Sequence, residues 1–290
     1  MFEAVRELAM LRVFRDWSVL IAIWSAAAMV AGVFIWLLAD IAMQGAPRFD
    51  LSFLIDAPGN SGRSGGIGPI LVSTALILTV AIAATVPVGL GAAIFLSEFT
   101  RSGGLPGRAM GLSLDVLAGV PSIVFGLFGN AFFCIWLGLG FSILSGGLTL
   151  ACMVLPVFIR VAEAGLRMTP GDWRNGAAAL GLSRLAVLRQ ILLPAAAPSL
   201  VLALMLGIGR SASETAALIF TSGYVDRMPA SLLDSGRAIS VHIYDLSMNV
   251  AGGDPGAYAS ALALIVFLFL INGAAKWITD SLIGRRIVTI

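Results

Sequence analysis

Long uncharged apolar runs alternate with shorter polar stretches along this chain of 290 residues. A helix needs about 20 apolar residues to cross the hydrocarbon core of a bilayer. The runs near or above this length are 18–39, 70–96, 116–139, 143–159, 200–220 and 259–278. The pattern predicts an all-α membrane protein, in which residues 18–290 form one polytopic domain of six transmembrane helices.

Residues 1–17 have a different pattern, in which apolar residues such as Phe2, Val5 and Leu8 are interleaved with charged ones. This pattern predicts an amphipathic helix that lies along the cytoplasmic interface of the membrane. The run that follows is too long for the apolar core of a signal peptide, and no small-x-small cleavage site follows it. We therefore expect the first run to be retained as a span.

Basic residues predict the orientation of the six spans, because loops rich in Lys and Arg stay in the cytoplasm. They lie before the first run, after the second, after the fourth and at the end of the chain, at Arg6, Arg12, Arg15, Arg101, Arg108, Arg167, Arg174, Arg184, Arg189, Lys276, Arg285 and Arg286. All of them fall on one side if six helices alternate. Both termini are therefore expected in the cytoplasm.

Composition supports a membrane protein and excludes several other classes. Hydrophobic residues make up 59% of the chain and charged residues only 12%, about half the charged share of soluble domains. The formal charge of +2 gives no reason to expect a nucleic-acid partner. Cys134 and Cys152 lie inside apolar runs without a CxxC spacing, and His242 has no neighbouring ligand residue. No metal site is expected.

The chain also lacks the sequence needed to hydrolyse ATP. A P-loop has the form GxxxxGK(S/T), because its lysine must reach the nucleotide phosphates. Lys276 is the single lysine, and no glycine loop precedes it. We expect no cofactor in this chain, so any ATP hydrolysis would be done by another chain.

A polar loop over about 169–194 is predicted to form two short helices. Pro170 and Asp172 mark the start of the first helix, and Gly181 allows the chain to turn. Ser183 offers an N-cap for the second helix, which Pro194 is expected to end. Two interpretations stay open, namely helices that lie on the lipid surface and a knob that docks a cytoplasmic partner.

Residues 175–181 and 191–194 of this loop resemble the coupling loop of ABC-importer permeases, whose signature is written EAA-x3-G-x9-I-x-LP. The resemblance implies that the loop contacts an ATPase through Asn175, Gly176, Ala177, Gly181, Leu193 and Pro194. Asn175 and Gly176 depart from the usual Glu and Ala, so a charged contact at Asn175 is not assumed.

Four further segments resemble the phosphate-specific transport permeases, the A subunit more than its C partner, and the resemblance runs from about 65 to 286. They are 65–69, 118–129, 155–160 and 207–216. The resemblance implies a bacterial inner-membrane, non-catalytic subunit that moves phosphate from periplasm to cytoplasm. It also implies three kinds of partner: a second homologous permease, two cytoplasmic ATPase subunits that bind ATP and Mg, and a periplasmic phosphate-binding protein.

Arg210 and Glu214 stand four residues apart inside the fifth predicted span and would share one helical face. A charge at the bilayer centre costs about 2.5–3.5 kcal/mol on insertion scales, so it calls for a role. One interpretation is a substrate pathway in which Arg210 attracts an anion and Glu214 prevents that anion from binding too tightly. Arginine suits this role because its planar fork matches phosphate oxygens. The alternative is an ion pair that stabilises the bundle.

Arg160 and Ser122 are the other pathway candidates. Arg160 lies near the cytoplasmic end of the fourth span, where its side chain could instead reach the interface, and Glu163 is its expected local partner. Gly119, Pro121 and Ser122 interrupt the third span near its start. Irregular backbone at membrane depth often lines a transport site; the alternative is a simple proline kink.

The leading hypothesis is thus the permease of a phosphate importer. Alternatives are a permease for another oxyanion or a phosphonate, a secondary transporter in which Arg210 and Glu214 relay protons, and a scaffold without a pathway. Residues 222–258 form a long periplasmic loop that could act as a lid or as a docking surface for the binding protein.

Overall fold

The computed structural model describes residues 2–100 and 104–287. Arg101 and the side chains of the N-terminal amphipathic pattern lie outside the described part. The helices are α1 Phe2–Gly45, α2 Leu51–Ile55, α3 Gly68–Ile94, α4 Leu105–Ala118, α5 Ser122–Gly129, α6 Ile143–Arg167, α7 Gly171–Ala179, α8 Arg184–Val187, α9 Leu193–Ala212, α10 Ala216–Ile219, α11 Ile239–Met248 and α12 Asp254–Ile287.

Shorter elements connect these helices. Strands β1 (Pro58–Gly59) and β2 (Ser64–Gly65) form an antiparallel hairpin, with Pro58 opposite Gly65. Two 3-10 turns and three π-helical segments complete the fold: η1 Ala46–Arg48, η2 Asn60–Gly62, η3 Phe95–Phe99, η4 Asn130–Trp136 and η5 Leu188–Leu192. Segment η3 directly follows α3, η4 follows the short α5, and η5 directly precedes α9.

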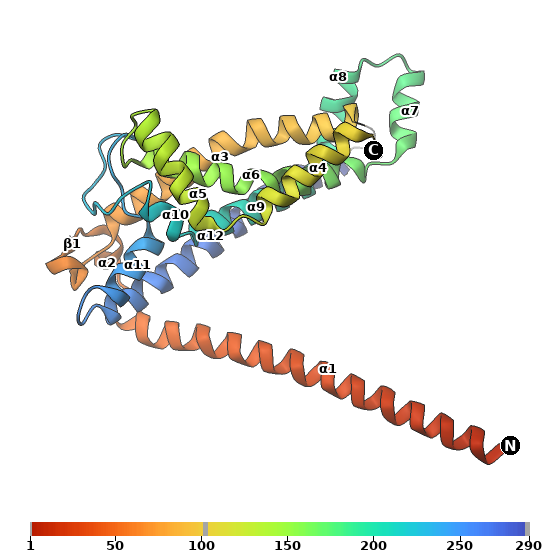
Figure 1. The fold of residues 1–290 in the computed structure, drawn as a ribbon, viewed down its shortest axis with the longest axis horizontal. Coiled ribbons are helices and arrows are strands. Elements are labelled where there is room, and N and C mark those ends of the chain that lie inside the picture. The colour runs from red at the N-terminus through yellow and green to blue at the C-terminus, as the bar shows by residue number, and fades with distance from the viewer. Residues whose placement is uncertain (1, 101–103, 288–290) are drawn as a thin grey trace.

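Helices α3, α6 and α9 pack together at the centre of the molecule (Figure 1). Helix α6 is the most enclosed, because 67% of its apolar stretch is buried, against 0% for α1. Small residues allow the close approach of α6 to its neighbours. A side chain at Gly147 would meet Val80 of α3, and one at Gly165 would meet Ser199 of α9.

Five described helices are long and apolar enough to cross a membrane. They are Asp16–Arg48, Gly68–Phe99, Ile143–Arg167, Arg184–Ala212 and Asp254–Trp277. The pair Gly107–Ala118 and Ser122–Trp136, bent by 96°, raises the number to six if it forms one span. The predicted all-α membrane fold is confirmed.

Two helix boundaries differ from those predicted. No separate interfacial helix ends at residue 17, because α1 continues from Phe2 to Gly45 and stands apart from the bundle over most of its length (Figure 1). The third predicted span is not one helix, because the chain breaks between α4 and α5 at Gly119 to Pro121. A bend of 96° is much sharper than a proline kink.

The fifth span ends earlier than predicted. Helix α9 stops at Ala212, where the Ser213 hydroxyl donates to the carbonyl oxygens of Gly209 and Arg210. The Glu214 carboxylate then accepts the amide of Ala217 in the short α10 at 3.2 Å. These side-chain bonds satisfy backbone groups that would otherwise continue the helix. Residues 200–220 are therefore two helices with a break between them.

Candidate functional site

Arg210 lies in the last turn of α9 with its side chain exposed, and Glu214 lies beyond the helix end. The prediction that they share one helical face is therefore wrong. Among the residues that the structure describes, no carboxylate lies within ion-pair distance of the Arg210 guanidinium. The carboxylate of Glu214 instead caps α10. Arg210 thus presents a free cation at the end of a candidate span.

Arg160 has a different environment, because α4 and α6 supply it with partners. Its Nη2 donates to the Asp115 carboxylate at 2.7 Å and to the Gly111 carbonyl oxygen at 2.8 Å. The expected partner Glu163 lies 3.6 Å from Nη1. Glu163 also accepts from Arg167 Nε at 2.9 Å. Arg160 is therefore paired within the chain and joins α4 to α6. Its contact with Asp115 was not predicted from the sequence.

Ser122 is the first residue of α5, directly after the break. Its side chain is half-buried, and α5 begins there after Pro121 with extended backbone. The structure places Ser122, Arg160 and Arg210 on three different elements: α5, α6 and α9. It does not join their side chains by a hydrogen bond or an ion pair among the described residues.

The 169–194 loop contains α7 and α8, which meet at Gly181 with φ of +71°. Only glycine adopts this backbone conformation without strain. Ser183 caps α8 by accepting the amide of Ala186 at 3.3 Å. The expected stop at Pro194 is wrong, since α8 continues through η5 into α9 and Pro194 lies in the first turn of α9. A proline inside a continuing helix removes one backbone hydrogen bond, and the π-helical segment η5 ends at Leu192, two residues before Pro194, where the regular hydrogen-bond pattern is already interrupted.

The remaining loop candidates differ in exposure. Asn175 and Gly176 lie on the exposed side of α7, and a side chain at Gly176 would meet open space. Ala177 points inward and is only 4% exposed. Leu193, at the start of α9, is half-buried. Helix α7 thus has one exposed face and one packed face, which suits a helix that touches a second chain.

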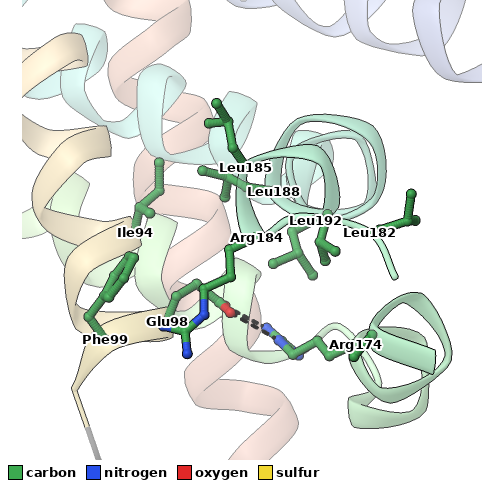
Figure 2. A pocket seen from close by; sticks show the side chains of 11 residues that line it. Ile94, Glu98, Phe99, Arg174, Leu182, Arg184, Leu185, Leu188 and Leu192 are labelled. Atoms are coloured by element: carbon green, nitrogen blue, oxygen red, sulfur yellow. Dashed lines mark hydrogen bonds and ion pairs between the residues drawn. The ribbon is translucent and has the colours of Figure 1, made fainter. Parts of the chain in front are cut away.

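A cavity of about 470 Å³ lies beneath this loop (Figure 2). Its lining combines the end of α3 with the two loop helices and includes Ile94, Phe99, Leu185 and Leu188. Two arginines from the loop border it. Arg184 places its guanidinium carbon 6.0 Å from the centre of the Phe99 ring, and Arg174 pairs with Glu98 at 2.8 Å. Sequence reasoning missed Glu98, although it is an acidic residue at the end of an apolar run.

The opposite end of the bundle holds a second polar cluster around Arg237. Its guanidinium lies 3.3 Å from the Asp245 carboxylate and 3.8 Å from that of Asp226. It also donates to the Tyr224 carbonyl oxygen at 2.8 Å and lies 3.3 Å from Nδ1 of the buried His242. Residues 222–258 are therefore a folded cap that includes α11. Sequence reasoning assigned His242 no partner, and the structure supplies one.

Comparison with known proteins shows which family and which proteins this chain resembles. The family described as "binding-protein-dependent transport system inner membrane component" matches residues 85–284. The chain is 29% identical to the probable ABC transporter permease protein YqgI of Bacillus subtilis, over 87% of this chain and 90% of the relative. It is 31% identical to phosphate transport system permease protein PstA 2 of Mycobacterium bovis, over 86% and 84%.

A longer relative and a solved structure extend this finding. A PstA homologue of Mycoplasma pneumoniae is 32% identical over 90% of this chain, which spans only 40% of that protein. An inward-facing structure of the MetNI methionine ABC transporter covers 73% of this chain and 95% of its own, with a TM-score of 0.57 and 17% identity. At this identity the likeness concerns the fold alone.

Proposed function

Because the chain belongs to the family of binding-protein-dependent transport system inner membrane components, we propose that it is the permease through which an ATP-driven importer moves inorganic phosphate into the cell. Members of this family are the non-catalytic, membrane-spanning components of ABC importers. The chain is accordingly a multi-pass inner-membrane protein that works with an ATPase and a substrate-binding protein. Phosphate is the part of the proposal that goes beyond the family.

The exposed guanidinium of Arg210 is the observation that carries the choice of an anion. It lies in the last turn of the candidate span Arg184–Ala212, and a charge without a partner is expensive wherever that turn is held away from water. A bound anion can supply the missing negative charge, and a guanidinium forms paired hydrogen bonds with phosphate oxygens. Arg160 is a weaker candidate for this contact, because Asp115 and Glu163 already neutralise it. Glu214 and Ser122 stay in the proposal as neighbours along the pathway.

Relatives support phosphate as the anion. Two proteins that are 31% and 32% identical to this chain are named as phosphate transport permeases. The proposed complex contains a second homologous permease, two ATPase subunits that bind ATP and Mg, and a periplasmic phosphate-binding protein. The loop that holds Asn175, Gly176, Ala177, Gly181, Leu193 and Pro194 is proposed to form the contact with one ATPase subunit, with the buried Ala177 packing behind the exposed face. The exposed face of α7 supports that contact.

A permease for another oxyanion or a phosphonate is the second candidate. A guanidinium binds several oxyanions by the same paired hydrogen bonds. In addition, the YqgI relative is named as a probable ABC permease without a stated substrate. The two candidates share the fold and the ATPase contact, and they differ only in which anion is transported.

Uptake of labelled phosphate and sulfate into proteoliposomes tests the proposal. The complete complex should take up phosphate only with ATP and the loaded binding protein. Arg210→Ala should lower this uptake by roughly 100-fold, since a charged hydrogen bond contributes about 1.5–3 kcal/mol. Arg210→Lys should retain part of the uptake, because it keeps the charge and loses the planar fork.

Arg108→Ala is the matched control, since Arg108 is an exposed arginine of α4; it should transport at the parental rate. Arg210→Ala complexes that assemble normally and still move phosphate at the parental rate would refute the pathway role. Uptake of sulfate in place of phosphate would favour the second candidate.

A further inference from the structure

Arg174 is the most heavily bonded side chain of the 169–194 loop. Its Nη2 donates to Glu98 Oε1 at 2.8 Å, and its Nε donates to Glu98 Oε2 at 3.3 Å. Nη1 donates to the Thr169 carbonyl oxygen at 2.7 Å, and Nη2 donates also to that of Leu166 at 3.0 Å. One guanidinium therefore joins three segments: α7, the end of α6 and the end of α3. Figure 2 shows its contact with Glu98.

Of the two carbonyl groups that Arg174 binds, that of Leu166 lies in the last turn of α6 and that of Thr169 lies two residues beyond its end. The last carbonyls of a helix lack partners within the helix and carry partial negative charge. Arg174 supplies both the hydrogen bonds and the opposite charge. The two carboxylate contacts are bidentate, which fixes the orientation of the guanidinium plane. The side chains of Arg174 and Glu98 are only 27% and 21% exposed, so water weakens the pair less than on an open surface.

Glu98 belongs to η3, the π-helical segment that ends α3. Single π-helical turns occur frequently at functional positions. A second arginine reaches the same segment, because Arg167 Nη2 donates to the Leu96 carbonyl oxygen at 2.6 Å. The end of α3 is thus attached to α6 by Arg167 and to α7 by Arg174. The cavity beside these contacts lies between Ile94 at the end of α3 and Ala178 of α7, both of which line it.

The neighbouring residue Asn175 has the opposite character. It is uncharged and lies on the exposed side of α7. The proposed ATPase contact therefore uses one side of α7, and the attachment to the bundle uses Arg174 on the other. A displacement of the exposed side of α7 would be transmitted to the ends of α3 and α6 through the hydrogen bonds of Arg174.

We propose that Arg174 and Glu98 are positioning residues that couple the movement of α7 to the cytoplasmic ends of α3 and α6. The inference rests on the proposed function, since it assigns the path by which an ATPase movement enters the permease. Neither residue touches the transported anion or ATP in this mechanism. Their task is to keep α7 and the ends of α3 and α6 moving as one unit.

Two variants test this role in the full complex. Glu98→Gln keeps the shape of the side chain and removes its charge, and Arg174→Lys keeps the charge and loses the fork. The phosphate taken up per ATP hydrolysed should fall about tenfold in each, while ATP hydrolysis falls much less. Arg108→Ala is the matched control, because it removes an exposed arginine from α4; it should leave the ratio unchanged.

Hydrogen exchange measures the attachment without reference to the substrate. The amides of Gly171–Ala179 should exchange about tenfold faster in both variants, whereas those of α11 should keep the parental rate. The inference would be overturned if the α7 amides of both variants exchanged at the parental rate. It would also be overturned if phosphate uptake and ATP hydrolysis fell in parallel because less complex assembled. If the complex with the unchanged sequence moved no phosphate, the proposed function would be refuted. The exchange rates of the α7 amides would still test the inference, because they do not depend on the substrate.

Discussion

Arginine side chains in this protein divide by whether the fold gives them a negative partner. Arg160, Arg174 and Arg237 each contact at least one carboxylate, and their charge is used to join elements. Arg210 has no such partner among the described residues and lies in a candidate span. A cation without a counter-ion is costly where water is excluded, so an unpaired arginine at the end of this span is compatible with the proposed contact with an anion. The same residue type thus serves structure in one place and is proposed to serve transport in another.

His242 illustrates how burial sets the protonation of a single residue. It is 1% exposed, and burial together with the nearby Arg237 lowers its pKa from 6.5 to about 4, although Asp226 and Asp245 act in the opposite direction. Because Arg237 can only donate a hydrogen bond, Nδ1 must accept it and the proton lies on Nε2. The ring is therefore neutral in the folded cap.

The stability of the cap should depend on pH through His242. The unfolded chain binds a proton on this ring below pH 6.5, whereas the folded chain resists protonation down to about pH 4. The stabilisation is therefore complete above pH 6.5 and is lost as the pH falls toward 4, by about 3 kcal/mol in total. Thermal unfolding in detergent at pH 7 and pH 5 measures this loss. His242→Gln should flatten the difference, and an unchanged pH dependence in that variant would contradict it.

Contacts between helices depend on small residues at the points of closest approach. Gly147 of α6 faces α3, and a Cβ there would lie 2.6 Å from the Val80 Cβ. Gly165 faces Ser199 of α9 in the same way. Helix α6 can therefore lie between α3 and α9 with its backbone close to both. The central position of α6 follows from this pattern of glycines together with its apolar surface.

Gly147→Leu should destabilise the bundle, because the new side chain has no space between α6 and α3. Overpacking of this kind costs about 1–3 kcal/mol. Gly32→Ala is the matched control, since a Cβ at Gly32 of α1 meets no atom within 4 Å. Thermal unfolding of both variants in the same detergent should show a lower midpoint for Gly147→Leu alone. Equal midpoints would show that the α3–α6 contact can relax.

The whole molecule has two distinct ends. One end carries α7 and α8, and the other carries the β-hairpin, α11 and the cap (Figure 1). Helix α1 stands apart from the bundle, and its large apolar side chains between Trp17 and Leu37 are exposed, so lipid or another chain must cover them in a membrane. Such a surface agrees with an inner-membrane component of a transport system, as the family description states.

Labelling of single cysteines tests the expected topology. After Cys134 and Cys152 are replaced, Ser231→Cys in the cap and Arg108→Cys on α4 place a thiol at exposed positions near the two ends. The basic residues predict a cytoplasmic location for Arg108 and for both termini. A membrane-impermeant maleimide should label Ser231→Cys in intact spheroplasts and Arg108→Cys only after permeabilisation. The reverse result would invert the proposed orientation.

Hydropathy, charge and the loop signature were sufficient to predict the fold class and the permease family. A transmembrane helix is predicted from the length of an apolar run. The resemblance to the coupling loop of ABC importers depends on the spacing from Gly181 to Ile191. These properties are local in the chain, so they can be seen without a structure. The lack of a P-loop with its lysine can likewise be read directly from the sequence.

Ion pairing and helix ends were decided by the tertiary structure. Arg210 and Glu214 have helical spacing, yet hydrogen bonds of Ser213 and Glu214 end α9 between them. Arg160 meets Asp115, 45 residues away, and Arg174 meets Glu98, 76 residues away. Such partners are chosen by the packing of helices that are distant in sequence. The sequence by itself therefore determined which residues carry charge, and only the fold determined which of those charges stay unpaired.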